Sequence, residues 1–181
     1  MSSQASYDVV IAGAGPAGAW ALKHLPEGMS ILLVDAADPL RSFRDNKLCG
    51  GMLTAQAQAL LPELPLEIRA EPFKTKMEYH DVDTGVYARF PVDYANCRRN
   101  LLDEWLLRQA LEAKGGDVEY SPDTRVSGLQ ADEEGVLVRL DEKREVKARR
   151  FFDCTGWRQF ARRALGASLT PYFHALQAEC S

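Results

Sequence analysis

The strongest constraint on this sequence lies at its start, where an apolar run passes into three spaced glycines. Residues 7–12 (Tyr-Asp-Val-Val-Ile-Ala) predict a buried strand, and Gly13, Gly15 and Gly18 follow it in the pattern G-x-G-x-x-G. Such glycines allow a tight turn out of the strand, a close backbone approach to a phosphate, and packing of the next helix on the strand. The pattern predicts a β-α-β unit that binds a dinucleotide.

A second apolar run, residues 31–34, ends on Asp35, about 20 residues beyond the glycines. A carboxylate at this place accepts hydrogen bonds from the diol of an adenosine ribose. Ala36 and Ala37 follow, and no arginine is placed to meet a 2′-phosphate, so the pattern disfavours NADP. NAD and FAD both fit, because both carry an adenosine ribose and a pyrophosphate. The alternative is an ordinary strand-turn-helix corner.

Composition and charge limit the classes of protein to which this chain can belong. The 181 residues are 46% hydrophobic and 27% charged, which is typical of one globular domain. A net charge of -4 argues against a nucleic-acid surface, which needs clustered Lys and Arg. No apolar run approaches the ~20 residues of a membrane span and no secretory signal is present, so we expect a cytoplasmic chain and leave peripheral membrane contact open. The four cysteines form no C-x-x-C pair and the three histidines have no ligand spacing, so we expect no metal site.

The remaining sequence alternates helical and strand patterns. We expect a loop over 36–53, a helix capped by Thr54 that ends before Pro62, and a connector of undefined structure to Pro72. Further on we expect a hairpin (76–80 and 86–90), a helix (100–114), four strands (118–120, 124–128, 136–140 and 149–152), a turn at 153–156, a short helix (159–165) and a last strand candidate (172–180).

Four spaced segments together resemble the FAD-dependent geranylgeranyl reductase family, within the flavoproteins that include the aromatic-ring hydroxylases. These are the opening glycine segment, Lys47-Leu-Cys-Gly-Gly51, residues 92–110 with Arg99 at a helix start, and residues 152–166. The resemblance implies an α/β, Rossmann-like FAD-binding fold of three layers: a parallel sheet, helices and a small antiparallel β-layer. It also implies an FAD-binding domain over 1–166 and the start of a substrate-domain strand over 167–181. The family's second flavin motif, which contains Gly-Asp, is missing, so we expect a chain truncated before its substrate domain is complete.

The resemblance also implies a set of cofactor-binding residues. Arg99 would lie beside the pyrophosphate, the alternative being a surface arginine paired with Asp103 or Glu104. Val126 would meet the adenine through its main chain, which is compatible with a place in the core. The implied set is Gly13, Gly15, Pro16, Ala17, Gly18, Asp35, Ala36, Cys49, Gly50, Gly51, Arg99 and Val126.

The resemblance does not define the chemical roles of Cys49 and Thr155. The loop of Cys49 would lie beside the isoalloxazine, but a small polarizable wall or a structural cysteine fits as well as a nucleophile. No residue is therefore assigned a catalytic step. Thr155 stands where the family has an aspartate, so its hydroxyl would have to hydrogen-bond the local backbone for the turn to survive.

The function implied by the resemblance is reduction of isoprenoid C=C bonds by an FAD-dependent oxidoreductase. Its substrate would be a prenyl lipid or another small molecule, and NADPH or ferredoxin would supply electrons. One alternative keeps FAD and changes the reaction to oxygenation or halogenation. Another is a non-catalytic nucleotide-binding fragment.

Overall fold

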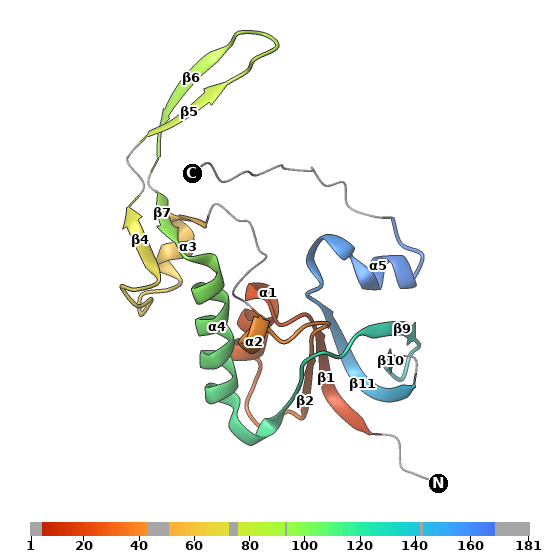
Figure 1. The fold of residues 1–181 in the computed structure, drawn as a ribbon. Coiled ribbons are helices and arrows are strands. Elements are labelled where there is room, and N and C mark those ends of the chain that lie inside the picture. The colour runs from red at the N-terminus through yellow and green to blue at the C-terminus, as the bar shows by residue number, and fades with distance from the viewer. Residues whose placement is uncertain (1–4, 43–50, 73–75, 93, 142, 169–181) are drawn as a thin grey trace. The chain divides into compact units, whose positions relative to one another are not determined.

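Two apolar runs at the start of the chain form the centre of a parallel sheet. A computed structural model of the chain describes residues 5–42, 51–72, 76–92, 94–141 and 143–168 (Figure 1). Strand β1 (Ser6–Ala12) lies between β2 (Ile31–Val34) and β11 (Arg144–Asp153), and β8 (Val118–Ser121) lies beyond β2; all these neighbours pair in parallel. Residues 31–34 are fully buried, as expected for a strand covered on both faces.

The other strands of this sheet form an antiparallel meander. Strand β9 (Val126–Ala131) pairs with β10 (Val136–Leu140), and β10 pairs with the first half of β11, so the order is β8-β2-β1-β11-β10-β9. The second half of β11 pairs with β1. Strand β11 is ten residues long and so belongs to both the parallel sheet and the meander.

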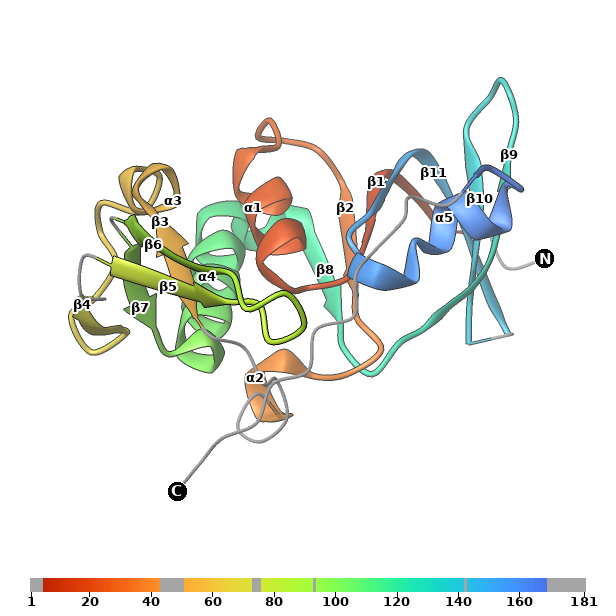
Figure 2. The same cartoon turned by 90° about the horizontal axis from the view of Figure 1, so that it is seen from above.

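Alternate side chains of the parallel strands face two different layers. Val10, Ala12, Leu32 and Val34 pack with meander residues in one buried cluster, to which the meander contributes Val126, Val138, Leu140, Val146 and Ala148. The helices α1 (Pro16–His24) and α4 (Arg99–Lys114) lie on the side of the parallel strands away from the meander (Figure 2). The predicted α/β fold of three layers is confirmed.

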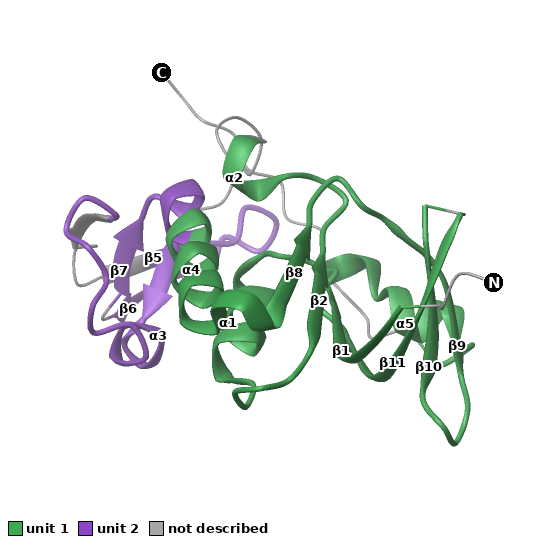
Figure 3. Cartoon of the chain, turned by 90° about the horizontal axis from the view of Figure 1, so that it is seen from below, with its two compact units in different colours: residues 1–45, 103–176 green, residues 46–102, 177–181 purple. Residues whose placement is uncertain are grey.

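Contacts within the chain divide it into two compact units (Figure 3). Unit 1 comprises residues 1–45 and 103–176 and contains the six-stranded sheet; unit 2 comprises residues 46–102 and 177–181. Helix α4 crosses the boundary between Leu102 and Asp103. The proposed division into a cofactor domain over 1–166 and a substrate strand from 167 stays a prediction.

Unit 2 consists of short elements. Strands β3 (Met52–Thr54), β7 (Tyr94–Cys97) and β4 (Arg69–Pro72) form an antiparallel sheet in the order β3-β7-β4, and β5 (Lys76–His80) pairs with β6 (Tyr87–Pro91) as a hairpin. Helix α3 (Ala55–Ala59) begins at Thr54, whose Oγ1 accepts a hydrogen bond of 3.2 Å from the amide of Ala57. The predicted hairpin and the predicted cap are confirmed.

The structure corrects several predicted boundaries. The expected loop after Asp35 contains helix α2 (Pro39–Ser42) and strand β3, and the connector before Pro72 ends in β4. Strand β9 begins at Val126 rather than at residue 124, and β11 begins at Arg144 rather than at residue 149. Short helix α5 (Phe160–Ala164) follows the turn η2 (Gly156–Arg158), and a second short turn, η1 (Gly115–Asp117), ends α4. The strand candidate 172–180 lies outside the described residues.

Within the described part of the chain, no helix combines the length and the hydropathy that a bilayer span requires.

Candidate functional site

The glycine loop after β1 is locked by its neighbours. Gly13 has a φ of +105°, which L side chains rarely adopt, and its amide donates a 2.8 Å hydrogen bond to the carbonyl of Val34. A Cβ built on Gly13 would lie 2.4 Å from the carbonyl oxygen of Cys154 at the end of β11. The position therefore requires glycine both for its conformation and for its space.

Gly18 is required by close packing of the helix on the loop. A Cβ at this position would lie 1.8 Å from the carbonyl oxygen of Gly13. Helix α1 takes Gly15 as its N-cap and Pro16 as its first residue, without a side-chain cap, and Ala17 is exposed. Because the first amides of a helix have no partner within it, the exposed end of α1 offers donors and a positive dipole end to an anion.

Asp35 lies at the same edge of the sheet, at the end of β2. Its Oδ2 accepts a 2.7 Å hydrogen bond from the amide of Ala14, and its Oδ1 accepts one of 3.0 Å from the amide of Ala37. A carboxylate has about four acceptor positions, so both oxygens retain capacity for a diol. The side chain is partly buried and Ala36 is exposed. The fold thus brings the predicted glycines and acid together.

Residues at the end of β11 pack against the glycine loop. The amide of Cys154 donates a 2.8 Å hydrogen bond to the carbonyl of Ala12. Burial, with a smaller effect of the Asp153 charge, raises the pKa of the Cys154 thiol. The thiol therefore stays protonated at neutral pH and serves as packing beneath the glycines, rather than as a nucleophile.

Asp153 has a structural role in this corner that the sequence did not predict. Its Oδ1 accepts hydrogen bonds from the amide and the hydroxyl of Thr155 at 3.1 and 2.6 Å, and its Oδ2 accepts one of 2.8 Å from the amide of Ala161 in α5. The Thr155 hydroxyl also accepts a 3.3 Å hydrogen bond from the amide of Phe160. The expected local bonding of Thr155 is confirmed, and a carboxylate two residues earlier holds the turn. An aspartate at a strand end before a T-G turn is the signal that could have found it.

Val126 stands at the start of β9, and its side chain packs in the core cluster with Val34 and Ala12. It is 9% exposed, so the side chain is structural and leaves only its main chain for a ligand. The neighbouring loop reaches the Asp35 corner directly, because the amide of Thr124 donates a 2.7 Å hydrogen bond to the carbonyl of Asp35.

The other predicted residues belong to unit 2. Gly51 has a φ of +64°, and a Cβ there would lie 2.1 Å from the carbonyl oxygen of Cys97 in β7, so this glycine is required for packing within its own unit. Arg99 is the first residue of α4 and is partly buried. Cys49 and Gly50 lie outside the described residues. Their predicted contacts with a cofactor stay predictions.

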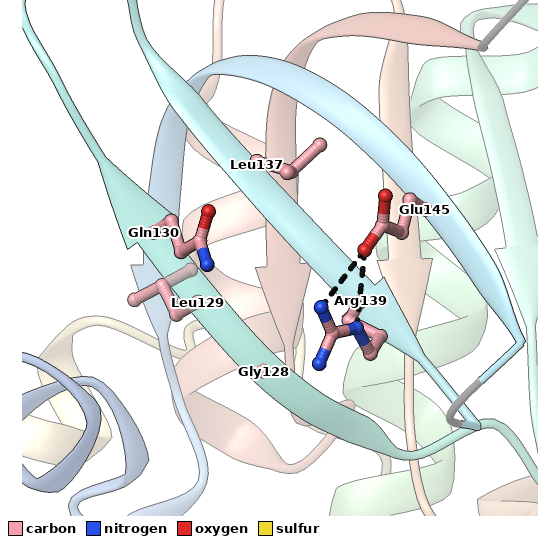
Figure 4. A pocket seen from close by; sticks show the side chains of 6 residues that line it. All are labelled: Gly128, Leu129, Gln130, Leu137, Arg139 and Glu145. Atoms are coloured by element: carbon pink, nitrogen blue, oxygen red, sulfur yellow. Dashed lines mark hydrogen bonds and ion pairs between the residues drawn. The ribbon is translucent and has the colours of Figure 1, made fainter.

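A small pocket of about 130 Å³ lies on the meander and is lined by Gly128, Leu129, Gln130, Leu137, Arg139 and Glu145 (Figure 4). Its polar centre is an exposed ion pair, in which Arg139 donates to Glu145 at 3.0 and 3.1 Å. None of the predicted site residues lines this pocket, so it lies apart from the candidate site at Asp35.

Among the described residues, no group of three or more His, Cys, Asp or Glu side chains is arranged to hold a metal.

Comparison with known proteins gives relatives that are distant in sequence. No family model matches the chain. Protein CbrA of Escherichia coli K12 and its counterpart in Shigella flexneri are each 26% identical to the chain over 164 residues, which is 88% of the chain. The chain spans 44 to 46% of the length of these relatives.

Several solved structures share the fold. A geranylgeranyl bacteriochlorophyll reductase-like protein from Thermoplasma acidophilum superposes with a TM-score of 0.66 at 17% identity, over 90% of this chain and 42% of its own. The p-nitrophenol 4-monooxygenase PnpA of Pseudomonas putida gives 0.67 at 18% identity, over 90% and 44%. The L111Y mutant of the halogenase PltM in complex with FAD gives 0.63 at 19% identity, over 88% and 36%. At these identities the likeness establishes the fold alone.

Proposed function

We propose that this chain is the FAD-binding part of an FAD-dependent oxidoreductase. The observation that carries the proposal is the corner formed by the glycine loop, the end of α1 and Asp35. The loop has no room for side chains at Gly13 and Gly18, the helix end presents amides to a pyrophosphate, and Asp35 presents acceptors to a ribose diol. FAD, as a bound group, supplies the electron-transfer chemistry, and the chain supplies binding and orientation.

FAD is favoured over NAD by the antiparallel layer packed on the parallel sheet. The solved structures that share this arrangement include a halogenase bound to FAD. The meander contributes Val126 beside the Asp35 corner, where main-chain groups would meet an adenine. Arg99 and the Cys49-Gly50-Gly51 loop would complete the site on the flavin side. The assignments of these five residues form part of the proposal.

For the reaction, we propose reduction of an isoprenoid C=C bond in a prenyl lipid, with electrons from NADPH or ferredoxin. The resemblance of residues 47–51 to the reductase loop and the likeness to a reductase-like fold support it. Oxygenation or halogenation is the second candidate, because a monooxygenase and a halogenase share the fold at similar TM-scores. A nucleotide-binding role without turnover is the third, since the chain spans less than half of its CbrA relatives.

The test of the cofactor assignment is reconstitution of the purified chain with FAD. Bound flavin should appear as absorbance near ~450 nm that stays with the protein through gel filtration. Asp35→Ala should lose this retention, because a charged acceptor for the ribose is removed, whereas Asp83→Ala on the exposed hairpin turn should retain it. Failure of the wild-type chain to take up FAD would refute the assignment.

The reactions are separated by product analysis of the chain after reconstitution with FAD. Anaerobic incubation with a reduced donor and a polyunsaturated prenyl lipid should give a product heavier by two hydrogens per reduced bond. An oxygen-dependent hydroxylated or halogenated product would favour the second candidate. Flavin binding without either product would leave the nucleotide-binding role.

A further inference from the structure

A cluster of four side chains stands beside Asp35 at the ends of β2 and β8. It comprises Asp38, Arg41, Tyr120 and Asp123, and we call it the ribose-corner cluster. The Nε of Arg41 donates to Oδ2 of Asp38, and its Nη2 donates to Oδ2 of Asp123 at 2.5 Å. The hydroxyl of Tyr120 donates to Oδ1 of Asp38 at 3.4 Å. One guanidinium is thus held between two carboxylates.

Backbone hydrogen bonds fix the ribose-corner cluster to the proposed ribose acid. The amide of Asp123 donates to the carbonyl of Ala37 at 3.3 Å, and the amide of Ala37 donates to Oδ1 of Asp35 at 3.0 Å. The amide of Thr124 donates to the carbonyl of Asp35 at 2.7 Å. The two loops therefore form one surface at the end of the sheet.

This surface is negative. The carboxylates of Asp35, Asp38 and Asp123 and the guanidinium of Arg41 sum to a formal charge of −2 (three negative groups and one positive). Burial alone would raise the pKa of Asp38, which is 9% exposed, but hydrogen bonds from Arg41 and the amide of Leu40 outweigh it and lower the pKa. Burial, together with the Asp38 and Asp35 charges, raises the pKa of Tyr120, so the phenol remains a neutral donor.

We propose that the ribose-corner cluster makes the site reject adenosine carrying a 2′-phosphate, and that Asp38 and Asp123 do so by occupying Arg41. The inference rests on the proposed function, which places an adenosine ribose at Asp35. A 2′-phosphate brings about two further negative charges, and sites that accept it supply an arginine for them. Here the nearby arginine already donates to two carboxylates, and the net charge of the surface repels the phosphate.

The contact of Arg41 with Asp123 lies at the surface, whereas its other partner, Asp38, is mostly buried. The side chain of Arg41 is 70% exposed and that of Asp123 is 59% exposed, and ion pairs between such groups are weak. Loss of the Asp123 charge would release Nη2 of Arg41 while its Nε still donates to Asp38, so that one edge of the guanidinium could meet a phosphate. Asp123 has a φ of +53°, a conformation that asparagine tolerates well, so Asp123→Asn changes the charge without changing the loop.

Binding of ADP-ribose and 2′-phospho-ADP-ribose to the chain, measured by isothermal titration calorimetry, tests the inference. The wild-type protein should prefer ADP-ribose by about tenfold or more, because like charges face the 2′-phosphate. Asp123→Asn should reduce that preference about fivefold or more by tighter binding of the phosphorylated ligand. Adding Arg41→Gln should remove the gain. Glu27→Gln, which removes one charge in the exposed turn before β2, should change neither affinity.

Each outcome has a separate meaning. If the wild-type protein binds neither ligand, the proposed nucleotide site fails, and the inference fails with it. If it binds both with equal affinity, the proposed function stands and the selectivity is refuted. A gain in Asp123→Asn that is matched by Glu27→Gln, or that persists without Arg41, would overturn the role assigned to Arg41. Arg41→Gln alone should keep the wild-type preference.

Discussion

Replacement of Gly18 by alanine should be among the most damaging single-methyl changes in this chain. The added Cβ would lie 1.8 Å from the carbonyl oxygen of Gly13 and 2.9 Å from its carbonyl carbon. Ordinary contact begins near 3.4 Å, so helix and loop would have to separate by roughly 1.6 Å. The obstacle is backbone, so no side-chain rotation relieves it.

The expected cost follows from this geometry. Overpacking usually costs about 1–3 kcal/mol, and we expect about 3 kcal/mol here because the loop is also fixed by the hydrogen bond from Gly13 to Val34. For a chain of this length, that corresponds to a fall of about 6–12 °C in Tm. Where the variant remains folded, FAD retention should also fall, because the displaced loop is the proposed pyrophosphate site.

Urea unfolding followed by circular dichroism measures this change, with Gly116→Ala as the matched control. A Cβ at Gly116 would meet nothing within 4 Å, and its φ is not in the positive range, so we expect an effect within about 0.5 kcal/mol. Equal unfolding free energies of the two variants would show that the close approach of α1 to the glycine loop does not constrain position 18.

Three further results are expected. Asp153→Ala should cost about 1–2 kcal/mol in urea unfolding, because it removes three hydrogen bonds that hold the turn and α5, and no more loss than in the exposed Asp83→Ala would refute that role. Arg99→Ala should weaken FAD binding by ~1.5–3 kcal/mol if its guanidinium meets the pyrophosphate, whereas Arg108→Ala on the same helix should not; equal fluorescence titrations would reject the assignment. Because the pKa of Asp38 is lower in the folded protein than its ordinary value of 3.8, its charge stabilises the fold at pH values above 3.8, and this stabilisation is lost as the pH falls through the folded pKa. Asp38→Asn should therefore lose less unfolding free energy than wild type between neutral pH and pH ~3. Parallel curves of unfolding free energy against pH would contradict this expectation.

The sequence was sufficient to predict the placement of those candidate-site residues that depend on a local pattern. The apolar runs predicted β1 and β2, and the glycine spacing predicted Gly13 and Gly18, where the structure leaves no room for a side chain. Asp35 was placed correctly because a strand end fixes where the next side chain emerges. These features depend on residues close together in the chain, which a single sequence displays.

The missed features depend on contacts between distant segments. Arg41 meets Asp123 across 82 residues, and nothing in the run after Asp35 distinguishes a guanidinium held by carboxylates from a free one. Strands β3, β4 and β7 are three or four residues long, too short to show an alternating pattern, and among the described residues they pair with one another alone. The role of Asp153 was hidden because one of its partners, Ala161, lies in a helix that the turn itself positions.

The proposed function requires that this chain bind the adenosine half of FAD. The most direct test is a comparison of FAD with FMN, which carries the same flavin ring without adenosine, in equilibrium titrations monitored by flavin fluorescence. We expect saturable binding of FAD, no more than weak binding of FMN, and displacement of FAD by ADP-ribose but not by riboflavin. Equal binding of FMN and FAD, or FAD binding that ADP-ribose does not displace, would contradict it.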